Sequence, residues 1–268
     1  MRKAVLLLIL GLAAWVGNCG MDGHTSRSHA VVAEQVVPQS MPAGVEVTVL
    51  EAEDKPGGML RYGIPDYRLP QETLDQEIAT ILRLGVSLKT GVRLGRDVQL
   101  AGLREQYDAV ILAYGAWKSQ SLRVEGEDRP GILKGIEFLY RVTRGEKVEL
   151  GPTVAVIGGG NTAIDSARTA VRLGAREVNL FYRRTDVEMP ASQTEVHEAV
   201  EEGVHFYYLT APVMVQDKGR GLKGLRLIKM ELGEPDASGR RRPVPVEGSE
   251  FEKEVDTIIT AIGQYPDT

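Results

Sequence analysis

The stretch Thr153–Arg184, TVAVIGGGNTAIDSARTAVRLGAREVNLFYRR, decides the fold of this chain. It begins with an apolar, valine-rich run, Val154–Ile157, which is typical of a strand buried on both faces. A run of glycines follows, then a helix-like segment, Asn161–Leu173, and a second apolar run, Val178–Tyr182. Strand, turn, helix and strand in this order predict one half of a Rossmann-like α/β domain.

The glycine turn has the spacing of a dinucleotide-binding fingerprint. In the pattern G-x-G-x-x-G/A its positions are Gly158, Gly160 and Ala163. The first glycine permits the tight turn, the second lets backbone N–H groups approach a pyrophosphate, and the small alanine lets helix and strand pack closely. Many glycine-rich matches are only flexible turns, but this one lies between a predicted strand and a predicted helix. That context predicts a dinucleotide site.

The residues at the end of the second strand indicate which dinucleotide binds. An NAD site usually places Asp or Glu here for the ribose 2′-hydroxyl, whereas an NADP site supplies Arg for the 2′-phosphate. This chain has Arg183 and Arg184, with no acidic residue until Asp186. A guanidinium matches a phosphate in charge and geometry, so NADPH is favoured over NADH. The alternative is a pair of solvated arginines after a strand.

The composition is that of a globular protein. The chain has 268 residues, a formal net charge of −5 and 43% hydrophobic residues, which is enough for one large or two modest domains. Its basic residues are dispersed, and the tight run Arg240–Arg242 falls in a predicted hairpin turn, where solvation explains it. We therefore expect no nucleic-acid partner.

Cysteine and histidine usage limits the chemistry further. Cys19 is the only cysteine, which excludes an intramolecular disulfide, a CxxC redox pair and a cysteine-ligated iron–sulfur cluster within this chain. The histidines lack metal-ligand spacing, so we expect no metal site.

Residues 1–44 form a segment with its own pattern. Two basic residues precede an apolar run, Ala4–Val16, which has the shape of a secretory signal and is too short for a comfortable transmembrane helix. Asn18 directly before Cys19 is a poor match to a lipidation site. Residues 21–42 indicate a linker or a poorly ordered stretch. Because an NADPH enzyme needs the cytosolic coenzyme pool, we expect a cytoplasmic protein without a membrane partner. Export through the signal-like segment is the alternative.

A second nucleotide-binding half is predicted upstream of the glycine turn. The strand Glu46–Leu50 ends at Glu51, where an acid accepts the ribose hydroxyls of an adenosine, although strand-end acids are as often surface charge. The window before it, residues 28–44, contains no G-x-G-x-x-G, so neither the strand nor the phosphate turn expected there is found. Other predicted elements are the helices Leu74–Leu84, Ile136–Val142 and Ala191–Glu202 and the buried strands Asp108–Ala113 and Asp256–Ala261.

Ordered motifs allow a comparison with a known family. They are EAEDKPGGMLRYGIPDYRLP at Glu51–Pro70, GGGNTAIDSARTA at Gly158–Ala170, YRRTDVEMPA at Tyr182–Ala191 and AIGQYPDT at Ala261–Thr268. By these motifs the chain from Val47 onward resembles the pyridine-nucleotide:flavin oxidoreductase module of the glutamate synthase small (β) subunit. It is also similar to the corresponding domains of dihydropyrimidine dehydrogenase.

The resemblance implies a glutathione-reductase-like α/β architecture, in which an NADPH domain is inserted into an FAD domain and both are Rossmann-like. We expect residues 45–150 to form a partial FAD domain, 151–262 the NADPH domain and 263–268 the return to the FAD domain. The implied FAD contacts are Glu51, Gly57, Gly58, Met59 and Arg68. The implied NADPH contacts are Gly159, Gly160, Asn161 and Thr162 at the phosphate turn, Arg183 and Arg184 at the 2′-phosphate, and Ala261, Ile262 and Gly263 near the nicotinamide.

The chemistry implied by the resemblance is hydride transfer from NADPH to FAD, followed by electron transfer to iron–sulfur clusters of a partner. That partner would be a large glutamate synthase-type subunit or another iron–sulfur protein. Since the cofactors carry this chemistry, no catalytic side chain is required, and no nucleophile or acid–base pair is found in the sequence.

The chain also departs from the family pattern. A cysteine-rich cluster domain has no counterpart, Tyr114 stands where the family usually has Thr, and the closing Gly-Asp motif would lie beyond Thr268. The resemblance therefore implies an FAD domain that is truncated at both ends. One alternative is a non-catalytic dinucleotide-binding fragment that cannot hold FAD. A thioredoxin-reductase-like enzyme is less well supported because the CxxC pair is missing.

Overall fold

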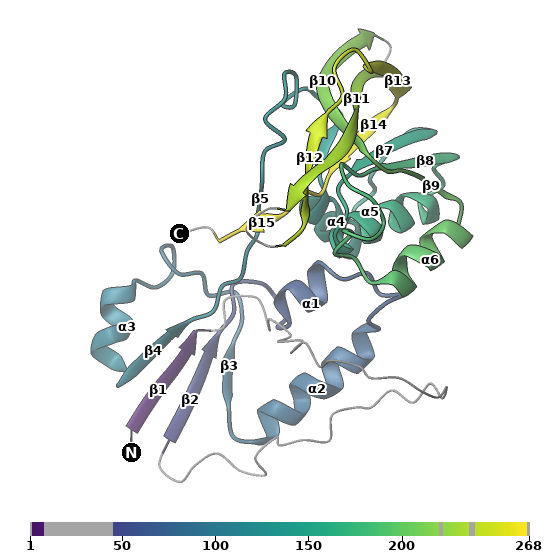
Figure 1. Ribbon diagram of the computed structural model, residues 1–268. Helices are drawn as coiled ribbons and strands as arrows, with labels where there is room; N and C mark the ends of the chain where they lie inside the picture. Colours follow the sequence, from purple (N-terminus) through teal and green to yellow (C-terminus); the bar gives the residue numbers. More distant parts are fainter. Residues whose placement is uncertain (1, 8–44, 220–221, 236–238, 267–268) are drawn as a thin grey trace, which may run out of the picture. The chain divides into compact units, whose positions relative to one another are not determined.

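The computed structural model describes residues 2–7, 45–219, 222–235 and 239–266 (Figure 1). The described residues form two compact units. The first unit comprises the described residues within Met1–Arg61 and Leu69–Gly115, and the second comprises those within Tyr62–Arg68 and Ala116–Thr268. Residues 116–150, which the sequence-based division placed in the partial FAD domain, thus lie in the second unit. The assignment of a cofactor to each domain stays a prediction.

The first unit is built on a parallel sheet with the strand order β3-β2-β1-β4. Its strands are β1 (Arg2–Leu7), β2 (Val45–Leu50), β3 (Ser87–Lys89) and β4 (Ala109–Leu112). The helices that follow β2 and β3 are α1 (Gly58–Tyr62), α2 (Gln71–Arg83) and α3 (Leu100–Gln106). Leu50 of β2 and Leu103 of α3 are the buried centre of a small apolar cluster.

Strand β1 corrects the expectation for the start of the chain. Arg2–Leu7, which was assigned to a signal-like segment, pairs in parallel with β2 on one side and with β4 on the other. A short apolar run is compatible with a signal core and with a strand, so export stays an alternative prediction. The structure does show a strand upstream of β2, which the sequence did not predict. The rest of the signal-like segment, the linker and Cys19 lie outside the described residues.

The second unit is built on a parallel sheet with the strand order β6-β14-β7-β8-β9. Its strands are β6 (Ile132–Lys134), β14 (Thr257–Thr260), β7 (Thr153–Ile157), β8 (Glu177–Phe181) and β9 (Val204–Tyr207). The helices are α4 (Gly135–Thr143), α5 (Asn161–Arg172) and α6 (Gln193–Glu201). The prediction of an α/β fold with parallel sheets is confirmed.

Both faces of this sheet are covered, because side chains alternate along each strand. Val154 and Val156 of β7 pack in one cluster with buried residues of α4, α5 and α6. Ala155 and Ile157 face the other way and pack against Val215, Leu225, Leu227 and Val255 of an antiparallel sheet. Because both faces are covered, β7 has no polar face in the sequence, and the prediction of a buried strand is confirmed.

The antiparallel sheet consists of β10 (Thr210–Gly219), β11 (Leu222–Pro235), β12 (Arg241–Pro245) and β13 (Phe251–Val255). Strand β11 pairs with β10, β12 and β13 (Figure 1). The predicted hairpin of β11 and β12 is confirmed, whereas β10 was not predicted. It contains Pro212, next to which the pairing register shifts, and a proline inside a run argues against a strand. The short strands β5 (Lys118–Ser119) and β15 (Gln264–Tyr265) pair with each other.

Candidate functional site

A pocket of about 460 Å³ lies where β7, β8 and β14 end. In open α/β sheets, ligands bind beyond the carboxyl ends of the strands, and this pocket has that position. All of its lining residues belong to the second unit: Gln120, Leu122, Ile157, Gly158, Gly159, Gly160, Thr162, Phe181, Tyr182, Arg183, Arg184, Pro190, Thr210, Ala211, Pro212, Arg240, Ala261, Ile262 and Gly263.

The three glycines of the turn meet different surroundings. A Cβ on Gly158, whose φ is +150°, would lie 2.2 Å from the carbonyl oxygen of Ala261. A Cβ on Gly159 would lie 2.4 Å from the ring of Tyr182. A Cβ on Gly160 would meet no described atom within 4 Å. The first two glycines are therefore required by the packing of the chain itself, whereas Gly160 leaves open space directly in front of helix α5.

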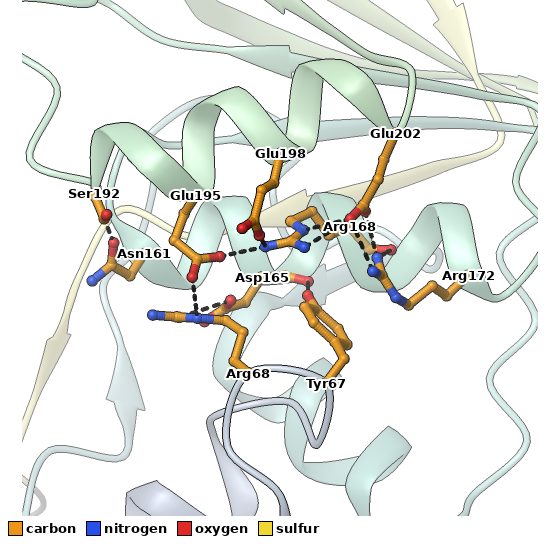
Figure 2. A network of polar contacts seen from close by, with 10 residues as sticks. All are labelled: Tyr67, Arg68, Asn161, Asp165, Arg168, Arg172, Ser192, Glu195, Glu198 and Glu202. Carbon is orange, nitrogen blue, oxygen red and sulfur yellow. Dashed lines mark hydrogen bonds and ion pairs between the residues drawn. The ribbon is translucent and has the colours of Figure 1, made fainter. Parts of the chain in front are cut away.

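Helix α5 presents its N-terminus to this space. Gly160 is its N-cap residue, and the first N–H groups of a helix have no partner within the helix, so they suit an anion such as a pyrophosphate. Thr162 lines the pocket, and its hydroxyl accepts a hydrogen bond from Gln264 Nε2 at 3.3 Å. Asn161 Oδ1 instead accepts from the backbone N–H of Ser192 at 3.0 Å (Figure 2). Ala163 is fully buried, as its role in close packing requires.

The two predicted arginines line the pocket just after β8. Arg183 is exposed, whereas Arg184 is buried, and its Nε donates to the carbonyl oxygen of Arg241 at 2.8 Å. The structure adds Arg240, from the β11–β12 hairpin, to the same pocket. From the sequence, Arg240 was expected to be a solvated turn residue. The run of arginines was the visible signal, but only the fold places it near β8.

The segment Ala261–Gly263 lies beside the glycine turn and lines the same pocket, and its implied place near the nicotinamide stays a prediction. The N–H of Ala261 donates to the carbonyl oxygen of Ile157 at 2.8 Å, and Gly263 O accepts from the N–H of Gln120 at 2.9 Å. Ile262 is partly exposed and lines the pocket between them. Pieces of chain about a hundred residues apart thus meet around one pocket.

The residues predicted to hold FAD in the first unit lie around the end of β2. Glu51 follows β2 and is 2% exposed, and its Oε1 accepts from the N–H of Glu53 at 2.8 Å. Burial raises the pKa of Glu51 to about 7, although the hydrogen bond from Glu53 lowers it in part. Gly57 and Gly58 both have positive φ, at +127° and +53°, and lead into α1, which contains Met59. A Cβ on Gly57 would lie 2.9 Å from Leu74.

Arg68 lies in the second unit and points toward α5 and α6 (Figure 2). Its Nη1 contacts both carboxylate oxygens of Asp165, at 2.9 and 2.7 Å, and its Nε donates to Glu195 Oε1 at 3.0 Å. The implied contact between Arg68 and FAD stays a prediction, and these donors are already directed at carboxylates. Burial raises the pKa of Asp165 to about 6, against the opposing effect of Arg68.

A wider charge network continues from Arg68 along the two helices (Figure 2). Arg168 of α5 forms ion pairs with Glu195, Glu198 and Glu202, and Arg172 pairs with Glu202. The Tyr67 ring lies beneath both guanidinium groups, 4.8 Å from Arg168 and 3.8 Å from Arg172. This network was not predicted from the sequence. The sequence pattern that could have indicated it is a set of acidic residues at positions 195, 198 and 202, along α6 and its C-cap, together with two arginines four residues apart on α5.

Neither a metal centre nor a membrane span is found in the part of the chain that the structure describes. There, no three His, Cys, Asp or Glu side chains are grouped so that they could hold a metal ion. In the same residues, every helix is too short or too polar to cross a bilayer.

Comparison with known proteins gives the family. The profile described as pyridine nucleotide-disulphide oxidoreductase matches residues 29–268. The NADP(+)-dependent formate dehydrogenase subunit beta of Moorella thermoacetica is 48% identical over 229 residues, which are 84% of this chain and 32% of that protein. The glutamate synthase [NADPH] small chain of Escherichia coli (strain K12) is 38% identical over 235 residues, or 83% of this chain and 50% of that protein. This chain thus spans about a third to a half of these relatives.

Among solved structures, Mycobacterium tuberculosis FprA in complex with NADPH has the same fold, with a TM-score of 0.70 and 22% identity over 82% of this chain and 64% of that one. The resemblance to the glutamate synthase small subunit is confirmed by the sequence comparison. The chain belongs to the pyridine nucleotide-disulphide oxidoreductase family.

Proposed function

We propose that this chain is the NADPH-binding part, with a portion of the flavin-binding part, of an NADPH-dependent flavin oxidoreductase. NADPH would supply a hydride and FAD would accept it, and the electrons would leave toward redox centres of a partner. The residues of this chain bind and orient the coenzyme, and no side-chain nucleophile is assigned.

One observation carries the proposal: the N-terminus of α5, with open space at Gly160, and the arginines after β8 face the same pocket. A helix N-terminus suits the pyrophosphate, and guanidinium groups suit the 2′-phosphate that distinguishes NADPH from NADH. Thr162 and Gly160 would lie at the pyrophosphate, Arg183 and Arg184 at the 2′-phosphate, and Ile262 and Gly263 toward the nicotinamide. The coenzyme specificity in the names of the Moorella and Escherichia relatives supports the same assignment.

The flavin assignment rests on the first unit. Glu51 stands directly after β2, where an acid holds the ribose hydroxyls of an adenosine, and its pKa of about 7 lets it accept or donate a hydrogen bond near neutral pH. Gly57 and Gly58 have positive φ angles and no side chains, so the backbone there can approach a ligand closely. Together with Met59 these residues would hold FAD.

The partner and the location follow from the same function. The Moorella and Escherichia relatives are named as a subunit beta and a small chain, which supports electron delivery to another subunit. An iron–sulfur protein such as a large glutamate synthase-type subunit would accept the electrons. Because NADPH is supplied by the cytosolic pool, we place the chain in the cytoplasm.

The test is the visible absorption spectrum of the purified chain after incubation with FAD and removal of the excess. We expect a retained flavin spectrum that bleaches under anaerobic conditions with NADPH and much more slowly with NADH. Equal bleaching by both coenzymes would contradict the role of the arginines. A colourless protein would leave a dinucleotide-binding fragment and overturn the proposal of a reductase.

A further inference from the structure

The β11–β12 hairpin returns to the end of β8 and places a third arginine at the proposed NADPH pocket. Arg240 immediately precedes β12 and lines the pocket together with Arg183 and Arg184. The hairpin and β8 are joined here by the hydrogen bond from Arg184 Nε to the carbonyl oxygen of Arg241, at 2.8 Å. Arg241, which follows Arg240, is therefore hydrogen-bonded to Arg184, one of the two predicted 2′-phosphate residues.

The turn end of the hairpin is held by contacts between its two strands. Arg241 pairs with Pro235, and its Nε and Nη2 donate to the carbonyl oxygens of Gly233 at 3.1 Å and Leu232 at 2.5 Å. The side chain of Arg241 is thus used within the hairpin. Arg240, one residue earlier, lines the pocket.

The acidic residues next to the arginine pair are engaged with donors of their own loop. Glu188 accepts from the hydroxyl and the N–H of Thr185, at 2.5 and 3.2 Å. Asp186 accepts from the N–H of Val187 at 3.0 Å. A phosphate with about two negative charges has oxygens for several guanidinium donors, so a third arginine at this end of the pocket adds to the two already there.

We propose that Arg240 is a specificity-determining residue that binds the 2′-phosphate of NADPH together with Arg183 and Arg184. This inference rests on the proposed use of NADPH and deepens it. It assigns a role to the hairpin, which supplies one phosphate-binding side chain and fixes the orientation of Arg184 through the carbonyl oxygen of Arg241.

The test uses the full chain and two nucleotides that differ only in the 2′-phosphate, 2′,5′-ADP and 5′-AMP, with binding measured by calorimetry. In Arg240→Ala we expect affinity for 2′,5′-ADP to fall about tenfold or more, with affinity for 5′-AMP changed less than about twofold. Arg240→Lys keeps the charge and loses the planar fork, so it should fall between the two.

Arg242→Ala is the matched control. Arg242 is an exposed residue of β12, two positions after Arg240, and carries the same charge, but it does not line the pocket. We expect the affinity of Arg242→Ala for 2′,5′-ADP to stay within about twofold of the wild-type chain, because an exposed charge that does not contact the ligand is largely screened by water and salt. Unfolding curves of both variants would show that the fold is retained.

The possible results distinguish a wrong role for Arg240 from a wrong coenzyme specificity of the pocket. If Arg240→Ala and Arg242→Ala lose equal affinity for 2′,5′-ADP, or if Arg240→Ala loses as much affinity for 5′-AMP, Arg240 does not recognise the 2′-phosphate and the inference is wrong. If the wild-type chain binds the two nucleotides equally, the proposed NADPH specificity itself fails.

Discussion

At the scale of single residues, the glycines of the turn differ in whether the fold itself excludes a side chain. Gly158 has a φ of +150°, and a side chain there would collide with the carbonyl of Ala261, so this position serves the backbone. Gly160 has a φ of −93°, which any residue can adopt, and a Cβ there would meet no described atom within 4 Å. No described contact requires a glycine at position 160, which agrees with the proposed pyrophosphate in front of α5.

This difference predicts opposite results for two alanine substitutions. Gly160→Ala should leave the unfolding temperature nearly unchanged and weaken NADP⁺ binding about tenfold or more, because the methyl group would occupy the space of the pyrophosphate. Gly158→Ala should lower the free energy of unfolding by about 2 kcal/mol or more, through strain and overpacking. Thermal unfolding and calorimetric binding measure both effects. Normal NADP⁺ binding by Gly160→Ala would argue against a pyrophosphate at this helix.

The arginines after β8 give a second prediction at this scale. Replacing Arg183 and Arg184 together with Ala should weaken NADPH binding far more than NADH binding, by about 1.5–3 kcal/mol for each charge-assisted contact. Binding constants for the two coenzymes, measured side by side, check this. An equal loss for both coenzymes would show that the pair does not recognise the 2′-phosphate.

At the scale of elements, the segment Tyr62–Arg68 and the helices α5 and α6 are joined by charges. Glu202, at the end of α6, pairs with Arg168 and Arg172 of α5, and its hydrogen bonds with Arg172 and then Arg168 lower its pKa to about 2. Asp165 of α5 shows the opposite shift, because burial raises its pKa to about 6. The same network therefore contains groups whose effects on stability change with pH in opposite directions.

The lowered pKa of Glu202 predicts how stability depends on pH. A carboxylate whose pKa is about 2 in the folded chain and 4.5 in the unfolded chain stabilises the fold above pH 4.5, and this contribution is lost as the pH falls toward 2. Glu202→Gln should therefore cost about 2 kcal/mol at pH 7, after allowance for solvent screening, and progressively less below pH 4.

Urea unfolding of the wild-type and variant chains at pH 7, 5 and 3 measures this dependence. Glu201→Gln is the control, because Glu201 lies next to Glu202 and its side chain is 65% exposed. It should resemble the wild-type chain at every pH, since exposed ion pairs contribute little. A difference between Glu202→Gln and the wild-type chain that stays constant from pH 7 to pH 3 would contradict the assigned pKa.

At the scale of the whole molecule, the described residues fall into two units, and every residue that lines the pocket belongs to the second. A ligand stabilises the part of a protein that binds it, by about 2.7 kcal/mol when its concentration is a hundred times the dissociation constant. The proposed coenzyme should therefore act mainly on the second unit.

Hydrogen exchange with and without NADP⁺ tests this. We expect slower exchange in β7 and β8 of the second unit and little change in β2 and β4 of the first, since only the former strands end at the pocket. NAD⁺ at the same concentration is the control and should have a smaller effect. Equal protection in both units would contradict the prediction and show that they open together.

Local patterns in the sequence were sufficient for the central βαβ stretch and much of the candidate site. The buried strand, the glycine turn and the arginines that follow β8 lie within Thr153–Arg184, and each follows from the steric and electrostatic demands of adjacent residues. The structure confirms the strands and helix of this stretch as β7, α5 and β8. It also brings the glycines and the arginines to one pocket.

Only the tertiary structure decided the features that depend on contacts between distant segments. At the apolar start of the chain, Arg2–Leu7 form strand β1, which pairs with β2, and β14 lies between β6 and β7 in the second sheet. The hydrogen bond that brings the Arg240 hairpin to Arg184 spans 57 residues, and the ion pair of Arg68 with Asp165 spans 97. A sequence pattern records the preference of a residue and its near neighbours, whereas these contacts depend on which distant strands and helices pack together.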